Sequence, residues 1–220
     1  MVTRIILVRH CEAQGNAEEV FQGHMNGAVT ENGLLQLSYL AEKMKAYPFD
    51  YLYSSPLIRA VMTAKACNTY YGKPIGLIED LMEIHGGEWE GQKWDTFPKE
   101  YARHNEAWLH RPWSFVAPEG EAMANVYRRM SETVDMLARR HAGKTVCIAS
   151  HGCAIRNYLC YAKGLQLEKL NEVAWCDNTG ISVVEYDDDF TVRLITENDN
   201  SHIPDSVSTL SKQTWWRNKE

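Results

Sequence analysis

Short apolar runs alternate with longer amphipathic segments along most of the chain. Four of these runs carry β-branched or aromatic residues or are bounded by turn signals, so they predict strands. They lie at Thr3–Val8, Asp50–Tyr53, Pro74–Ile78 and Thr145–Ala149. Two more runs, 181–186 and 191–196, flank three consecutive aspartates and predict a hairpin.

The segments between the strands carry helical signals. Apolar residues at 34, 37, 40, 41 and 44 have the spacing of an amphipathic helix, and Pro48 follows them. Ser54-Ser55-Pro56 is a helix-start pattern, with serine as the cap and proline in the first turn. The predicted helices cover 34–47, 54–71, 98–109, 119–141 with Gly143 closing it, and a last one ending near Ala162.

Alternating strands and helices predict an α/β layer fold with a mostly parallel sheet. No repeat, linker or low-complexity tract interrupts the chain, so residues 1–220 are expected to form a single domain. Gln14–Gly33 carries few helix signals and is expected to be a loop. The last twenty or so residues, about 200–220, are expected to be a polar tail, in which Trp215-Trp216 is unexplained.

Composition narrows the class of protein without changing this fold. The chain has 220 residues, of which 45% are hydrophobic and 24% charged, as in globular proteins. The net charge of −6 disfavours nucleic acid as a partner, and no apolar run is long enough to cross a membrane. Six cysteines without a C-x-x-C pair indicate reduced thiols. We therefore expect a soluble, cytoplasmic protein.

Polar residues follow the carboxyl ends of several predicted strands, where open parallel sheets bind their ligands. His10 follows the first strand beside Arg9, and His151 follows the fourth. Arg59 lies in the first turn of the helix after the second strand, and Glu83 lies in the loop beyond the third. These residues are expected to meet at one edge of the sheet.

The residue types suit phosphoryl transfer. Arginine forks match phosphate oxygens, a neutral imidazole is a nucleophile for phosphorus, and a carboxylic acid can protonate the departing oxygen. Phosphoryl transfer depends mainly on positioning and charge stabilisation. The set is therefore expected to work through a phosphohistidine, without a metal or another cofactor.

These residues also carry a resemblance. Leu7-Val8-Arg9-His10-Cys11-Glu12-Ala13, with Asn16 beyond it, resembles the Arg-His-Gly-Glu-Thr signature of the histidine phosphatase (phosphoglycerate mutase-like) superfamily. The resemblance covers roughly residues 3 to 186, and further matches follow in the family's order. They are Phe21-Gln22-Gly23, Thr30-Glu31-Asn32-Gly33, Ser54 to Ala60 with Thr63-Ala64, Leu81-Met82-Glu83-Ile84 with Gly87 to Gly91, Pro118 to Glu121, and Ser150-His151-Gly152 with Ile155-Arg156.

The resemblance implies a three-layer α/β/α sandwich and a role for each matching residue. His10 would become phosphorylated, and Arg9, Arg59 and His151 would bind the transferring phosphoryl group. Glu83 would donate a proton to the leaving oxygen and then act as base for the attacking water. The remaining matches, Asn16, Gln22 and Gly23, would add hydrogen bonds to the substrate.

Two positions depart from the family pattern. Cys11 replaces the usual glycine, which would cost about 1–2 kcal/mol if a positive φ were required and little if only room were required. Cys11 is also a candidate reactive thiol beside a cationic site. Ala13 replaces the usual threonine and so removes one hydroxyl from the pocket.

Residues 85–118 form an aromatic-rich excursion expected to be a helical lid. They hold Trp89, Trp94, Trp108 and Trp113. These side chains either build a small core of their own, which we favour for most of them, or shape the leaving-group pocket. His104 and Arg111 are candidates to face the substrate, whereas Arg128-Arg129 and Arg139-Arg140 are expected on the solvent face of their helix.

Three functions remain open. The favoured one is a phosphomonoester hydrolase of the phosphatase branch, acting on a small phosphorylated metabolite. Ile84-His85-Gly86-Gly87 favours it over a cofactor-dependent phosphoglycerate mutase, which typically has Arg-His-Tyr-Gly and a more basic insertion. The third is a catalytically degenerate phosphate-binding protein. The oligomeric state stays open, with a homodimer as one option.

Overall fold

A six-stranded sheet organises the protein, whose computed structural model describes residues 1–95 and 99–213. The order of the strands is β3-β2-β4-β1-β5-β6. The pairs joining β3, β2, β4 and β1 are parallel, and β5 and β6 add two antiparallel pairs. The strands are β1 Thr3–Arg9, β2 Tyr51–Ser54, β3 Ile75–Leu77, β4 Thr145–Ser150, β5 Ile181–Tyr186 and β6 Val192–Asp199.

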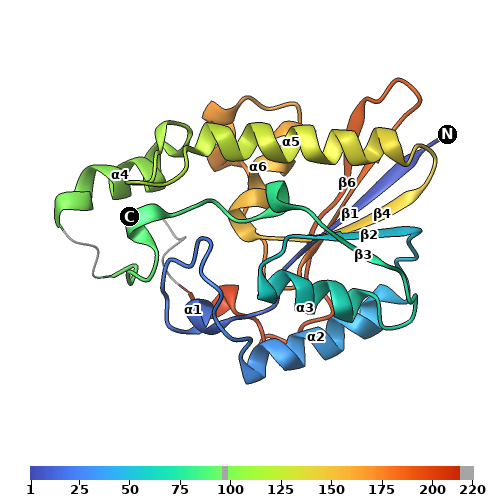
Figure 1. Ribbon diagram of the computed structural model, residues 1–220, viewed down its shortest axis with the longest axis horizontal. Helices are drawn as coiled ribbons and strands as arrows, with labels where there is room; N and C mark the ends of the chain where they lie inside the picture. Colours follow the sequence, from blue (N-terminus) through green and yellow to red (C-terminus); the bar gives the residue numbers. More distant parts are fainter. Residues whose placement is uncertain (96–98, 214–220) are drawn as a thin grey trace.

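Helices cover both faces of this sheet, so the predicted mostly parallel α/β fold with three layers is confirmed (Figure 1). Helices α2 and α3 lie on one face, and α5 and α6 lie on the other, with α4 at one end of the molecule (Figure 1). The helices are α1 Gln14–Ala17, α2 Glu31–Met44, α3 Ile58–Cys67, α4 Ala102–His110, α5 Met123–Arg140 and α6 Gly152–Ala162. None of the helices in the described ranges has the length and hydropathy needed to cross a membrane.

The alternation of side chains along the central strands explains why both faces need helices. In β1, Ile5 and Leu7 enter the core beneath α5 and α6, whereas Ile6 and Val8 enter the core beneath α2 and α3. All four are at most 1% exposed. A strand with apolar residues on both sides is stable only when both sides are covered.

The start of α3 differs from the prediction. Ser54 is the last residue of β2, paired in register with Ala149 of β4, so it is not the helix cap. Leu57 holds the cap position without a side-chain hydrogen bond, and the helix begins at Ile58. The hydroxyl of Ser55 instead accepts a weak bond from the Leu57 N–H at 3.3 Å.

Other boundaries shift by a few residues for local reasons. Helix α5 begins at Met123 rather than 119, because Glu119 has a φ of +52°, which no right-handed helix allows. It ends at Arg140, and Gly143 follows with a φ of +75°, as predicted for a closing glycine. The loop expected over Gln14–Gly33 contains the short helix α1. The predicted helix over 98–109 corresponds to α4, and residue 98 lies outside the described residues.

The expectation of a polar tail is wrong for residues 200–213, which we call the C-terminal strap. Two buried carboxylates hold it: Glu12 accepts from the hydroxyl of Thr209 at 2.7 Å, and Asp177 accepts from the hydroxyl of Ser208 at 2.5 Å. The strap therefore packs through polar side chains as well as through Ile203 and Val207, and a hydropathy pattern does not reveal the polar contacts. Trp215-Trp216 lies outside the described residues.

The central strand β4 provides a test of this core. Ile148 is fully buried, so Ile148→Ala is expected to lower the free energy of unfolding by about 2–5 kcal/mol through lost contacts and a cavity. The matched control is Ile195→Ala in β6, where isoleucine is 53% exposed and a change within about 0.5 kcal/mol is expected. Urea unfolding measures both. Equal losses would contradict the placement of the core.

Candidate active site

The two predicted histidines lie side by side where β1 and β4 end. Arg9, the last residue of β1, pairs in register with Ser150, the last residue of β4, so the residues that follow are neighbours. The ring centroids of His10 and His151 are 5.1 Å apart. Both rings are buried, and the convergence expected from parallel strand ends is therefore present.

One hydrogen bond defines the tautomer of His10. Its Nδ1 lies 2.6 Å from the backbone carbonyl of Cys11. A carbonyl oxygen only accepts, so Nδ1 carries the proton, and Nε2 of the neutral ring keeps its lone pair. Burial, together with the positive charges of Arg59 and Arg9, holds the pKa of His10 well below its ordinary value of 6.5. The ring is thus neutral at pH 7 and can act as a nucleophile.

Arg9 and Arg59 bring two guanidinium groups into the same buried region, at 4% and 1% exposure. Arg59 donates to the carbonyls of Gly23 and Met25, each at 2.7 Å, and Arg9 donates to the carbonyl of Cys176. Burial lowers the pKa of Arg59 to about 10, which leaves it charged at pH 7. The Nε atom of each arginine is buried without a hydrogen-bond partner among the described residues.

Two buried cations with unused donors form a site for an anion. Gly152 leaves the room that this arrangement needs, because a Cβ there would lie 3.1 Å from Nε of Arg9. A tetrahedral oxyanion such as phosphate matches donors of this kind.

Glu83 approaches the site from the loop after β3. Its Oε2 accepts from the N–H of Cys153 at 3.1 Å, and its Oε1 accepts from the N–H groups of Ala154 at 3.1 Å and Ile84 at 2.9 Å. Cys153 and Ala154 are in the first turn of α6, where backbone N–H groups have no partner inside the helix. The helix therefore fixes the carboxylate in place.

One cavity of about 60 Å³ brings most of the predicted residues together. A single water needs roughly 10–15 Å³, so the cavity has room for a phosphate-sized group or several waters. Gly23 shapes it with a φ of +48°, and Oε1 of Gln22 is buried without a partner among the described residues. The predicted residues that line it are Arg9, His10, Asn16, Gln22, Gly23, Arg59 and Glu83.

His151 lies against His10 and is absent from the wall of this cavity. Its Nε2 is 2.8 Å from the hydroxyl of Ser55, and its Nδ1 is buried without a partner among the described residues. Burial, with the charge of Arg59 next in size, holds its pKa well below 6.5. This ring is also neutral at pH 7.

Arg129 is a functional residue that the sequence analysis placed on the solvent face of α5. Instead it forms an ion pair with Glu121 at 2.8 Å and donates to the carbonyls of Asp80, Met82 and Glu83 at 2.6–3.1 Å. It therefore positions the segment that carries Glu83. The only signal in the sequence is its spacing from Val126, three residues earlier, on the buried side of the helix.

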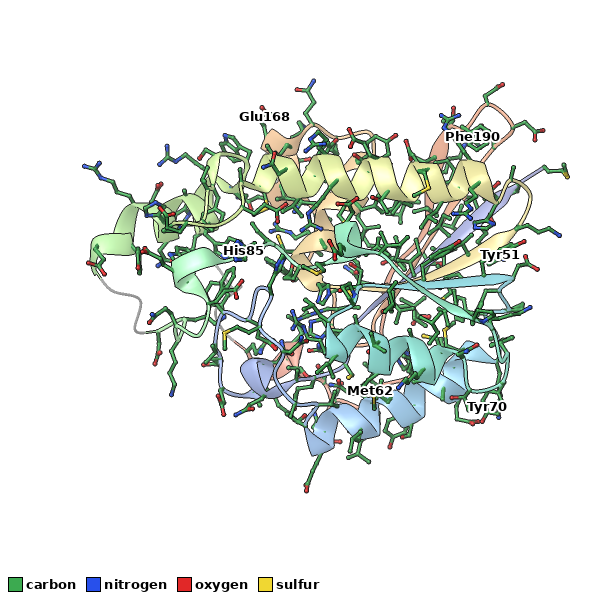
Figure 2. All side chains as sticks on the ribbon, viewed as in Figure 1. Tyr51, Met62, Tyr70, His85, Glu168 and Phe190 are labelled. Atoms are coloured by element: carbon green, nitrogen blue, oxygen red, sulfur yellow. The ribbon has the colours of Figure 1, made fainter. Side chains whose placement is uncertain are left out.

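Around Glu83, two further histidines meet. His24 approaches the Glu83 carbonyl with its Nε2 at 2.8 Å, and its ring centroid lies 4.9 Å from that of His85. His85, labelled in Figure 2, lies beside the N-terminal end of α5, where its N–H donates to Glu121. No group of three or more His, Cys, Asp or Glu side chains suited to a metal ion occurs in residues 1–95 and 99–213.

Cys11 is neither strained nor reactive. It is not among the described residues with a positive φ, its N–H donates to the hydroxyl of Thr63 at 2.9 Å, and its side chain is fully buried. Burial raises the pKa of its thiol to about 11, which disfavours the alternative of a reactive thiol. At Ala13, the backbone N–H donates to the side chain of Asn16 at 3.1 Å.

The aromatic excursion divides between the two predicted uses. Trp89 is fully buried and packs on Phe115 with centroids 4.9 Å apart, which makes a small core. Trp94 and Trp108, joined by Trp175 from outside the excursion, line the cavity. Neither of the candidates for facing the substrate does so: His104 and Arg111 are not on the cavity wall, and Arg111 pairs with Glu106 at the surface.

Fold and site together define an α/β protein with a cavity lined by two buried arginines and a histidine, and comparisons with known proteins give its family. The family model described as histidine phosphatase superfamily (branch 1) matches residues 5–199. The chain belongs to this family.

Individual relatives agree with this assignment. The chain is 28% identical to phosphoserine phosphatase 1 of Hydrogenobacter thermophilus over 187 residues, 85% of this chain and 88% of that protein. It is 30% identical to phosphoglycerate mutase-like protein 4 of Arabidopsis thaliana over 156 residues, 70% and 68% of the two chains. The solved structure of Bacillus stearothermophilus YhfR superposes with a TM-score of 0.87 at 29% identity, covering 92% of this chain and all of that one.

The lowered pKa of His10 predicts how stability depends on pH. Below pH 6.5 the unfolded chain binds a proton at this histidine that the folded protein does not, so acid favours unfolding. One such group lowers the free energy of unfolding by about 2 kcal/mol between pH 7 and pH 5. The free energy of unfolding of His10→Gln is therefore expected to fall by roughly 1–2 kcal/mol less than that of the wild type over this range. Urea unfolding at both pH values checks it, and identical losses in the two proteins would contradict it.

Proposed function

We propose that the protein is a metal-independent phosphomonoester hydrolase that acts through a phosphohistidine on a small phosphorylated metabolite. The observation that carries the proposal is the neutral ring of His10, with its Nε2 lone pair, beside the unused Nε donors of Arg9 and Arg59. A nucleophile and an anion site in one small cavity are the two requirements for transfer of a phosphoryl group to the protein.

In the first proposed step, Nε2 of His10 attacks phosphorus and the bond from phosphorus to the ester oxygen breaks. For this step Glu83, on the wall of the same cavity, is in its protonated form and gives its proton to the leaving oxygen, becoming the carboxylate. In the second step a water attacks phosphorus, the P–N bond breaks, and Glu83 takes the water's proton. Inorganic phosphate and free enzyme result.

Fixed groups stabilise the transferring phosphoryl in both steps. Arg9 and Arg59 supply positive charge to its oxygens, so the proposed steps use no metal ion. His151 has a supporting role from beside His10, behind the cavity wall: its Nε2 lies 2.8 Å from the hydroxyl of Ser55, and its buried Nδ1 is the nitrogen left to serve the phosphoryl group. The neutral residues Asn16, Gln22 and Gly23 complete the binding site.

A phosphoglycerate mutase is the second candidate, favoured by the mutase-like relative from Arabidopsis thaliana. The two reactions share the first step and differ in the acceptor of the phosphoryl group, which is water in a hydrolase and a sugar acid in a mutase. The relative from Hydrogenobacter thermophilus, matched over more of this chain, supports the hydrolase and an ester of a small hydroxyl compound.

Activity of the EDTA-treated protein tests the proposal directly. The wild type is expected to release phosphate from a panel of small phosphomonoesters, and His10→Ala is expected to lower the rate by at least about 10³-fold because it removes the nucleophile. His110→Ala, which alters an exposed histidine at the end of α4, is the control and is expected to retain activity.

Two results would overturn this reading. Phosphate release that stops with EDTA and returns with a divalent cation would contradict a metal-independent reaction. A phosphoryl group that moves between the hydroxyls of a phosphoglycerate, without release to water, would establish the mutase instead.

Glu83→Gln separates a proton donor from a merely structural carboxylate. Alkyl phosphates have poor leaving groups and are expected to slow by about 10²–10⁴-fold, whereas p-nitrophenyl phosphate, whose leaving group needs no proton, is expected to slow much less. The control is Glu88→Gln, where the carboxylate accepts from Tyr101 outside the cavity. Equal slowing of both ester classes in steady-state assays would exclude Glu83 as the general acid.

A further inference from the structure

Gln213 of the C-terminal strap is a cavity residue outside the part of the chain that the family model matches. It lines the same cavity as His10 and Glu83, and it is 4% exposed. The family match ends at residue 199, so Gln213 lies beyond the matched range.

The amide of Gln213 has a defined orientation. Its Nε2 donates to the backbone carbonyl of Asn16 at 2.8 Å. Because a carbonyl accepts and never donates, the nitrogen must face Asn16, and the amide cannot be turned around without losing this bond. The Oε1 atom on the other side is buried and has no partner among the described residues. A buried acceptor of this kind is left for a donor in the cavity.

The strap holds Gln213 firmly relative to the reacting atoms. The loop 176–179 binds both: the side chain of Asn178 donates to the carbonyl of His10 at 2.7 Å, and Asp177 accepts from the N–H of Leu210 at 3.0 Å. On the other side, Glu12 accepts from Thr209 at 2.7 Å. Segments next to His10 in the sequence and in space therefore fix the strap on both sides.

Three tryptophans form an aromatic part of the cavity wall. Trp108 lies with its ring centroid 6.2 Å from that of Trp175 and 5.7 Å from that of Trp94, and all three line the cavity. The guanidinium of Arg156 lies over the ring of Trp175, with its Cζ 4.6 Å from the ring centroid, and so holds this side chain in place. Such a wall covers the carbon skeleton of a leaving group, and the Gln213 oxygen adds a polar point to it.

From this arrangement we propose that Gln213 is a specificity-determining residue, whose Oε1 accepts a hydrogen bond from a hydroxyl or ammonium group on the leaving group of the substrate. The proposal rests on the proposed hydrolase function and adds a substrate class to it. That class is the phosphomonoesters of small polyols or amino alcohols. Esters without such a donor leave the buried amide oxygen unpaired and are expected to react more slowly.

Three esters of equal size test the donor directly: propyl phosphate, ethylene glycol monophosphate and ethanolamine phosphate, which end in a methyl, a hydroxyl and an ammonium group. For the wild type, kcat/KM is expected to be about tenfold higher for at least one donor-bearing ester than for propyl phosphate. In Gln213→Met the lost hydrogen bond to Asn16 affects all three esters alike, whereas the lost acceptor affects only the donor-bearing esters. The ratio of kcat/KM between donor-bearing esters and propyl phosphate is therefore the readout, and it is expected to fall to about one.

Lys212→Met is the matched control, since Lys212 is the exposed neighbour in the strap and donates to the carbonyl of Ser206. It is expected to keep the wild-type preference. If Gln213→Met does not fold, Gln213→Asn withdraws the acceptor by one methylene and is expected to lose the preference in the same way.

The outcomes separate this proposal from the proposed function. A wild type that hydrolyses all three esters equally well, or a Gln213→Met protein that slows all three equally, overturns the role of Gln213 and leaves the hydrolase intact. Absence of phosphate release from every ester, including p-nitrophenyl phosphate, overturns the hydrolase and this proposal together.

Discussion

The burial of two guanidinium cations, Arg9 and Arg59, is the constraint on which the rest of the site depends. A charged group removed from water is strongly destabilised unless hydrogen bonds or an opposite charge replace its hydration. Here the backbone carbonyls of Gly23, Met25 and Cys176 provide part of that replacement, so the loops that contain them are folded around the cations. The Nε donors of the two arginines, which these carbonyls do not reach, are available to bind an anion.

The same two charges determine the state of the groups around them. They act with burial to keep His10 neutral, and the charge of Arg59 acts in the same direction on His151. The side chain of Glu83 accepts hydrogen bonds from the N-terminus of α6, and Arg129 donates to the backbone carbonyl of the same residue. The arginines, the neutral His10 and Glu83 thus line one cavity without pairing with one another, because each forms its hydrogen bonds with backbone groups.

How much of this a sequence reveals depends on the range of the interactions involved. His10 and His151 could be placed because each directly follows a strand, and neighbouring parallel strands end at the same edge of the sheet. Arg129 could not, since three of its partners are backbone carbonyls more than forty residues away and the fourth, Glu121, lies before the helix begins. Ser54 was assigned to a helix cap because the pattern does not show that β2 extends through it to pair with Ala149. The packing of the strap is not apparent from the sequence because its few apolar residues, such as Ile203 and Val207, are buried together with polar residues bound to two distant carboxylates.

The strap also has a consequence for how the cavity is assembled. The residues proposed to move the phosphoryl group all lie within the matched range 5–199, whereas Gln213 belongs to a segment beyond it. A single substitution in the strap can therefore change one polar point of the wall while none of the residues that handle the phosphoryl group is replaced. The strap, which is synthesised after the whole matched range, thus completes a cavity whose first residues, Arg9 and His10, lie near the start of the chain.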